Sequence, residues 1–213
     1  MKFTLRPWES RIYITRLDFL LDPVYINPMS DPAKKNKNFS YRDYLTWPED
    51  ERWELIHGEA FAISPAPAFR HQKIVGSVFN QIYNQLKDKK CQPMVEPLDV
   101  RLTEKLEKNK EKIHVVQPDV LVFCDPEKAD DKGIVGAPDW ILEVLSDSTA
   151  WKDTTIKLEL YQQFGVREYW ILNPETQLLL VYVLKEGKFG LPTPYLGSVT
   201  VPVTIFPGVV IEI

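Results

Sequence analysis

The stretch Ala137-Pro-Asp-Trp-Ile-Leu-Glu-Val-Leu-Ser146 decides which fold this sequence can adopt. Trp140 to Leu145 is apolar without alternation, which predicts a strand that is buried on both faces of a sheet. Glu143 is the one charged residue inside that strand. A buried carboxylate is costly unless it is paired, hydrogen-bonded or bound to a metal. The fold must therefore supply Glu143 with a partner.

The composition is that of a globular chain with one domain. The 213 residues are 44% apolar and 26% charged, which is enough for a substantial core. The net charge of -4 gives no global attraction to polyanions, so any contact with nucleic acid needs a local basic patch. No apolar run approaches the roughly 20 residues of a membrane helix, and the N-terminus does not resemble a secretory signal. We therefore expect a cytoplasmic protein with no membrane association.

The two cysteines, Cys91 and Cys124, lie far apart in the sequence and match no metal or redox spacing. Because disulfide frameworks belong mainly to secreted chains, we expect two isolated, buried thiols.

The predicted elements follow the order helix, several strands, helix, strand and further strands. A hairpin from Trp53 to Ile63 should turn at His57-Gly58, and Ser40 is a plausible start for a short helix before it. Longer helices are predicted from Phe69 to Lys89 and from Asp147 or Ser148 to Phe164, where Gly165 ends the helix. Further strands are predicted at Met94–Leu102, Val115–Phe123, Val166–Leu172, Leu178–Leu184 and Val209–Ile213.

This order indicates a mixed α/β (α+β) domain built around one sheet and not a doubly wound repeat. Residues 39–213 should form the domain, and residues 1–38 an N-terminal extension that is either laid over it or disordered. Residues 103–112 should be a solvated loop, and residues 124–137 a long connection without regular structure. No G-x-G-x-x-G or P-loop motif is present, which argues against a nucleotide-binding fold.

Two carboxylates come together if residues 119–123 and 139–143 pair as antiparallel strands. With Phe123 opposite Asp139, Asp119 lies opposite Glu143, and their Cβ atoms are about 5 Å apart. Carboxylates that close repel each other and usually share a proton or hold a cation. Two carboxylates and several waters are a common magnesium site. A slip of one residue would move Asp119 to the other face, so this prediction depends on the register.

A third group is expected on the helix that follows Glu143. Asp153, Lys157 and Tyr161 recur every four residues and form a polar row beside the apolar stripe. A lysine near paired carboxylates and a metal can position water or stabilise charge on a phosphate. The alternative is an Asp–Lys pair on a solvated helix face, which contributes only a few tenths of a kcal/mol.

From Phe39 onwards the chain resembles the Uma-two family of restriction-type endonucleases, within the PD-(D/E)XK nuclease superfamily. The resemblance rests on Trp53-Glu-Leu-Ile-His-Gly-Glu59, Ser64-Pro-Ala-Pro67 with His71, Gln117-Pro-Asp119, Gly136-Ala-Pro-Asp139, Glu143-Val-Leu-Ser146, Asp153 with Lys157, Gly165-Val-Arg-Glu-Tyr-Trp170 and Asn173-Pro174. It implies a restriction-endonuclease-like core, in which helices flank a central mixed sheet and antiparallel hairpins are added.

The resemblance also implies a Mg²⁺ or Mn²⁺ ion held by Asp119, Glu143 and the backbone carbonyl near Val144. The lysine of the superfamily normally follows the acidic residue by two positions, where this chain has Leu145. The chain resembles members in which that lysine has moved to the next helix, so Lys157 takes the role. The implied activity is metal-dependent hydrolysis of DNA phosphodiester bonds.

Supporting residues have two interpretations each. Glu54 either completes the outer shell of the metal or is a plain surface carboxylate. His71 either reaches the site from the start of its helix or is a buried, hydrogen-bonded histidine. Asp153 is expected to orient Lys157. Basic residues that could form a rim around the site, or simply a solvated surface, are Arg52, Arg70, Lys73 and Lys152.

Two other functions are compatible with these residues. A nuclease fold kept as an inactive binding or assembly module would suit the acidic net charge, and a hydrolase of another phosphodiester would use the same site. The apolar tail strands could form a homodimer interface.

Overall fold

The computed structural model describes residues 38–63, 67–103 and 113–213. The predictions for the N-terminal extension and for the charged loop before Ile113 concern segments outside these ranges. No helix within the described ranges is long and apolar enough to cross a membrane.

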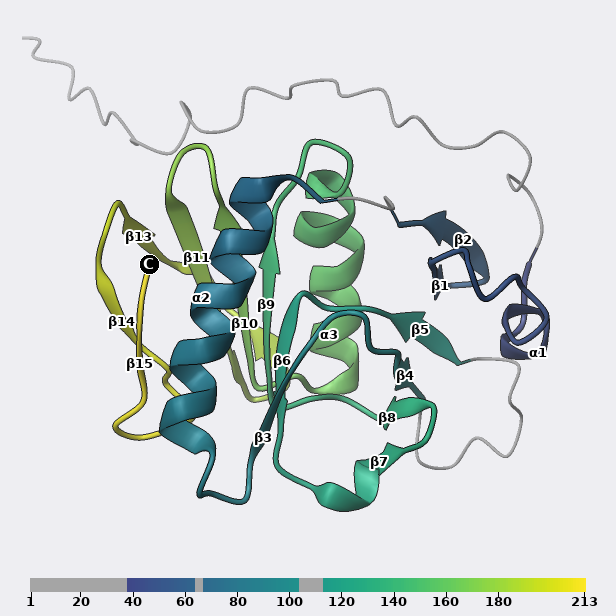
Figure 1. The fold of residues 1–213 in the computed structure, drawn as a ribbon, viewed down its shortest axis with the longest axis horizontal. Coiled ribbons are helices and arrows are strands. Elements are labelled where there is room, and N and C mark those ends of the chain that lie inside the picture. Colours follow the sequence, from purple (N-terminus) through teal and green to yellow (C-terminus); the bar gives the residue numbers. More distant parts are fainter. Residues whose placement is uncertain (1–37, 64–66, 104–112) are drawn as a thin grey trace, which may run out of the picture.

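A seven-stranded mixed sheet forms the centre of the fold (Figure 1). Its path is β12-β11-β10-β9-β6-β3, and β13 pairs with β11. The predicted strand at Glu143 is confirmed as β9, whose five residues are all buried between antiparallel β6 and parallel β10. The strands are β3 (Gln92–Val95), β6 (Val120–Phe123), β9 (Trp140–Val144), β10 (Glu168–Asn173), β11 (Leu178–Lys185), β12 (Lys188–Phe189) and β13 (Thr193–Leu196).

A second, six-stranded sheet lies beside the first in the order β2-β1-β5-β4-β8-β7. The predicted hairpin is confirmed, because Glu54 pairs with Phe61 and Ile56 with Glu59. The turn residues His57 and Gly58 have φ values of 51° and 79°, the left-handed conformation that a two-residue hairpin turn requires. The strands are β1 (Trp53–Ile56), β2 (Glu59–Ala62), β4 (Val100–Leu102), β5 (His114–Val116), β7 (Ala129–Asp130) and β8 (Gly133–Val135).

The expectation of a single sheet was therefore wrong, and so were three predicted segments. The strand expected at Met94–Leu102 is β3 and β4, and the strand expected at Val115–Phe123 is β5 and β6. In each case the two halves belong to different sheets. Pro97 and Pro118 lie at the two breaks, and proline lacks the N–H that a continuous ladder needs. The connection 124–137, expected to be irregular, contains β7 and β8.

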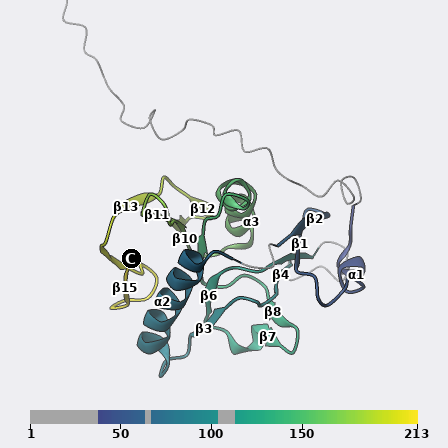
Figure 2. The same cartoon turned by 45° about the horizontal axis from the view of Figure 1, so that its top comes forward.

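Helices cover both faces of the central sheet. Helix α2 (Phe69–Leu86) packs on one face together with the hairpin of β14 (Thr200–Pro202) and β15 (Val210–Glu212). Helix α3 (Lys157–Phe164) packs on the other, where the second sheet also lies (Figures 1 and 2). The short helix α1 (Tyr41–Tyr44) has the predicted start, a capping box at Ser40. Both long helices were predicted, although α2 ends three residues earlier than expected, at Leu86.

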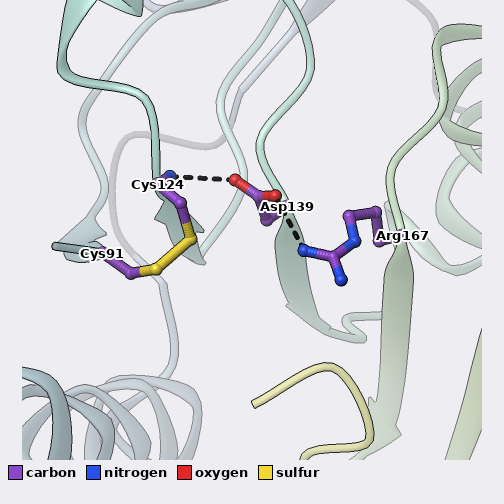
Figure 3. The surroundings of a disulfide bond; sticks show 4 residues. All are labelled: Cys91, Cys124, Asp139 and Arg167. Carbon is purple, nitrogen blue, oxygen red and sulfur yellow. Dashed lines mark hydrogen bonds and ion pairs between the residues drawn. A yellow bond between two sulfur atoms is a disulfide. The ribbon is translucent and has the colours of Figure 1, made fainter. Parts of the chain in front are cut away.

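The two cysteines form a disulfide, so the prediction of isolated thiols was wrong. They flank β3 and β6, where the pairing of Gln92 with Phe123 places Cys91 opposite Cys124. Although 33 residues separate the two cysteines in the sequence, their Cα atoms lie 3.9 Å apart. Figure 3 shows that the Cys124 N–H donates to Asp139, which also pairs with Arg167.

Candidate metal centre

Asp119 and Glu143 lie at the junction of β6 and β9. Val120 pairs with Leu142 in this ladder, so the register predicted from the sequence is confirmed and Asp119 lies opposite Glu143. Both residues are buried. The Val144 N–H donates to Asp119 Oδ2 over 2.6 Å, which fixes that carboxylate at the end of the strand.

Lys157 lies at the centre of a buried ionic cluster. Its Nζ is 2.8 Å from Glu54 Oε1 and 2.9 Å from Glu143 Oε1. Asp153 Oδ1 lies 3.3 Å from the same nitrogen. The Lys157 side chain is only 4% exposed, so the alternative of an Asp–Lys pair on a solvated face was wrong. The Tyr161 hydroxyl donates to the same Glu143 oxygen over 2.9 Å.

Glu54 joins the hairpin of the second sheet to this cluster. It accepts a hydrogen bond of 2.9 Å from the Gln117 N–H and forms an ion pair with Lys152. Because only 1% of the Glu54 side chain is exposed, the surface interpretation was wrong. Lys152, which the sequence placed among candidates for a surface rim, is buried as well.

A π-helical turn explains why Lys152 and Lys157 reach the same carboxylate. The helical segment is widened over Lys152–Ile156, where the Lys157 N–H donates to the Lys152 carbonyl five residues earlier. Widened turns of this kind occur frequently at functional sites. The helical spacing used in the sequence analysis assumed regular α-helix, so it could not place Lys152 in the cluster.

The cluster contains more acidic than basic side chains. Burial opposes ionisation of Glu54, but Lys152 and Lys157 outweigh it and lower the Glu54 pKa to about 2. Burial raises the pKa of Glu143 well above its usual range, and the charges of Asp153, Asp119 and Glu54 raise it further. An added cation beside Glu143 would therefore favour its ionised form.

His71, in the first turn of α2, approaches the cluster from the other face of the sheet. Its Nε2 is 3.2 Å from Asp119 Oδ2, and its buried Nδ1 has no hydrogen-bond partner within the described residues. Burial lowers the pKa of His71, but the hydrogen bond and charge of Asp119 outweigh it, so the pKa lies above its ordinary value. His71 therefore reaches the site, although as a partner of Asp119.

Glu96 is a candidate ligand that the sequence analysis missed. His71, Glu96 and Asp119 each present a ligand atom, and these atoms all lie within 4.8 Å of one another. Glu96 follows β3, and its N–H donates to the Asp119 carbonyl over 3.2 Å. Carboxylates with an imidazole suit a divalent first-row metal such as Mn²⁺ and are compatible with Mg²⁺. Glu96 could have been predicted as a ligand only from the pairing of β3 with β6, which the sequence did not indicate.

These groups line a cavity of about 600 Å³ that extends from the amino end of α2 to the segment before α3. Ala68, the residue before α2, lines this cavity and has no side-chain oxygen to cap the helix. The positive end of the α2 dipole therefore lies at the cavity without a side-chain cap from Ala68. Of the predicted basic rim, Arg52, Arg70 and Lys152 line this cavity, and Arg52 is also bonded to Glu96 and Gln117.

Comparisons with known proteins identify the family and the fold of this chain. A sequence model of the Uma2 family, described as "Putative restriction endonuclease", matches residues 41–213. The fold matches the crystal structure of a "putative nuclease belonging to DUF820" from Anabaena variabilis ATCC 29413, with a TM-score of 0.63 and 21% identity. That match covers 78% of this chain and 90% of the other, and at this identity it shows the fold alone. No curated protein matches the chain. Because the family match spans most of the sequence, the chain belongs to the Uma2 family of restriction-endonuclease-like proteins.

Proposed function

We propose that this protein is a metal-dependent endonuclease that hydrolyses phosphodiester bonds of DNA. One observation carries the proposal. Lys157 is held by Glu143 inside a buried acidic cluster, and Glu143 lies opposite Asp119 at the wall of an open cavity. Membership of a family described as restriction endonucleases supports a nucleic-acid substrate.

We assign Asp119, Glu143 and the Val144 carbonyl as the residues that would hold the Mg²⁺ or Mn²⁺ ion, with His71 and Glu96 beside them. The residues present fit such an ion. Within the described chain, the hydrogen bonds and ion pairs of Glu143 fall on Oε1, which leaves Oε2 for a cation. When bound, the metal would lower the pKa of a water molecule and neutralise charge on the phosphate.

Lys157 serves this reaction as a fixed positive charge. Burial lowers its pKa, but the charges of Glu143 and Glu54 outweigh that effect, so the pKa lies well above the ordinary value. A permanently protonated lysine stabilises developing negative charge or orients a water molecule, and it does not act as a general base. Glu54 and Asp153 position Lys157 through their ion pairs with its Nζ.

Plasmid cleavage tests the proposal. Purified protein should nick or cut plasmid DNA in Mg²⁺ or Mn²⁺, and Asp119→Ala and Glu143→Ala should abolish cleavage while the circular dichroism spectrum stays unchanged. Glu59→Ala is the matched control, because Glu59 is an exposed carboxylate in β2, on the same face of the β1–β2 hairpin as Glu54. Cleavage that survives in both site variants would refute the proposal.

The net charge of -4 favours one alternative, an inactive binding or assembly module with a nuclease fold. Calorimetric titration with Mn²⁺ separates the two, because a module without the chemistry need not bind metal at Asp119. Hydrolysis of another phosphodiester would appear as cleavage of a small diester without cleavage of plasmid.

We also propose a cytoplasmic location and a homodimer. The disulfide provides a test of the location, because such bonds are rare in the cytosol. Alkylation of both cysteines in intact cells would support a reducing compartment, and protection of both would contradict it. A monomeric mass in light scattering would refute the dimer.

A further inference from the structure

A second cavity, of about 460 Å³, adjoins the candidate metal centre. It lies between the first turns of α2, the turn that follows β10, and the end of β15. Arg70, Asn173, Pro174 and Glu175 line both cavities, so the two adjoin each other along these residues. We call this second space the α2 cavity.

The α2 cavity combines apolar walls with a small number of polar groups. Ile74, Val78 and Leu172 form part of the wall, and Phe69 stands at the start of α2 with 86% of its surface exposed. Asn173 Oδ1 accepts the N–H groups of the next turn, which leaves its amide nitrogen as a donor. Apolar walls with a few fixed polar groups are typical of sites for small organic ligands.

Two cationic and two acidic side chains line the α2 cavity. Arg70 and Lys73 lie on α2, and Arg70 Nη1 donates to the Pro174 carbonyl over 3.4 Å at the boundary between the cavities. Glu175 and Glu212, which lie outside α2, also line the space, so Arg70 and Lys73 are the two cationic groups that a phosphate could contact. A ligand with an apolar ring and an adjoining phosphate fits apolar walls with two cations on α2.

We propose that the α2 cavity binds an unpaired nucleotide of the nucleic-acid substrate, next to the phosphodiester that is cleaved. The base stacks on Phe69, and Arg70 and Lys73 contact the adjoining phosphates. A base inside a duplex is stacked and paired and cannot enter such a cavity, so the preferred substrate is single-stranded DNA or a duplex with a single-stranded end. This inference rests on the proposed function and specifies the substrate class of the same site.

Binding measured without cleavage tests the inference. A fluorescent single-stranded oligonucleotide and its duplex are titrated with the protein in EDTA, and the anisotropy is followed. We expect the single strand to bind at least tenfold more tightly. Phe69→Ala should weaken single-strand binding by about 5- to 150-fold, the usual range for loss of one base–aromatic stack, and Phe69→Trp should restore it. Because Phe69 is exposed, neither substitution threatens folding.

Tyr83→Ala is the matched control. Tyr83 is an aromatic residue on the same helix, 47% exposed, and lines neither cavity. Its removal should leave binding unchanged. Equal binding of the two DNA forms, or a Phe69→Ala variant that binds like the wild type, would overturn the inference.

Parallel cleavage assays in Mn²⁺ distinguish a failure of the nucleotide site from a failure of the endonuclease activity. Cleavage by the wild type with no effect of Phe69→Ala on single-strand binding would overturn the inference and leave the proposed function standing. Phe69-dependent binding without any metal-dependent cleavage would refute the endonuclease and support the nucleotide site.

Discussion

Replacement of Lys157 by Met tests whether the buried cluster depends on this one cation. Its Nζ lies 2.8 Å from Glu54, 2.9 Å from Glu143 and 3.3 Å from Asp153, and all four side chains are buried. Methionine keeps the length of the side chain, so the change removes charge and creates little empty volume. Breaking a buried ion pair costs about 3–5 kcal/mol, because the remaining charge stays in the interior without a partner. We expect Lys157→Met to lower the free energy of unfolding by that amount at pH 7.

The loss should depend on pH in a defined direction. Burial raises the pKa of folded Glu143 above the ordinary value of 4.5, and Lys157 opposes that rise, so removal of the lysine raises the pKa further. A carboxyl group whose folded pKa exceeds its unfolded pKa favours the folded state below the unfolded pKa, and this contribution is lost as pH rises. The free energy of unfolding of the variant should therefore approach that of the wild type as pH falls from 7 towards 4.5.

Urea unfolding followed by circular dichroism, in EDTA so that no metal contributes, measures the effect. Glu143→Gln added to Lys157→Met should recover part of the loss, because it removes one of the carboxylates left without a cation. Lys188→Met, at an exposed lysine in β12, is the control and should change little. A loss below about 1 kcal/mol at pH 7, with an unchanged slope in urea, would show that the cluster tolerates the missing charge and would refute the reasoning.

Three further predictions concern the scaffold. Reduction of Cys91–Cys124 should lower the free energy of unfolding by up to about 4 kcal/mol, from the loop entropy of a separation of 33 residues, and the double serine variant should not respond to reductant in a denaturant titration. Burial lowers the pKa of His114 to about 4, so folding excludes a proton there, and stability should decline as pH falls from 6.5 towards 4. Thermal unfolding of His114→Gln as a function of pH checks this prediction, because the variant should lose less stability than the wild type between pH 6.5 and 4. Gly133→Ala should destabilise by about 1–3 kcal/mol, because Gly133 has a φ of 116° and a Cβ there would collide with the Asp99 carbonyl; an unchanged melting temperature would contradict it.

Local pattern was sufficient to predict the strands of the site that lie on the central sheet, but not their register. An apolar run with a single carboxylate identifies β9, and the structure has the register that was assumed for residues 119–123 against 139–143. Lys157 followed from helical spacing and the family resemblance. Each of these inferences uses contacts within one strand pair or one helix, where sequence separation and distance are closely related.

The remaining features depend on contacts that sequence spacing does not encode. Cys91 meets Cys124 only because β3 and β6 are neighbours, and Lys152 joins the cluster only because the helix widens before Lys157. The burial of Glu54 requires the second sheet, which was predicted as part of the first. A propensity argument cannot reveal which of two sheets a short strand joins, because both offer the same hydrogen-bonding edge.

The two strand breaks missed in the sequence analysis are also the features that expose the candidate ligands. Glu96 follows β3 beside Pro97, where the chain leaves the central sheet for the second one, and Asp119 precedes β6 beside Pro118, where the chain returns. Both carboxylates line the metal-centre cavity.

Hydrogen bonds join the two segments that connect the sheets, one between β3 and β4 and the other between β5 and β6. Arg52 donates to Glu96 and to Gln117 over 2.6 and 2.9 Å, and Gln117 donates in turn to Asp99 over 2.8 Å. The Tyr44 hydroxyl of α1 donates to the same Asp99 carboxylate over 2.9 Å. This network joins the segment after β3 to the segment before β6, so the positions of Glu96 and Asp119 depend on the second sheet. The second sheet therefore acts as the support that places acidic groups at the edge of the first, beside Lys157.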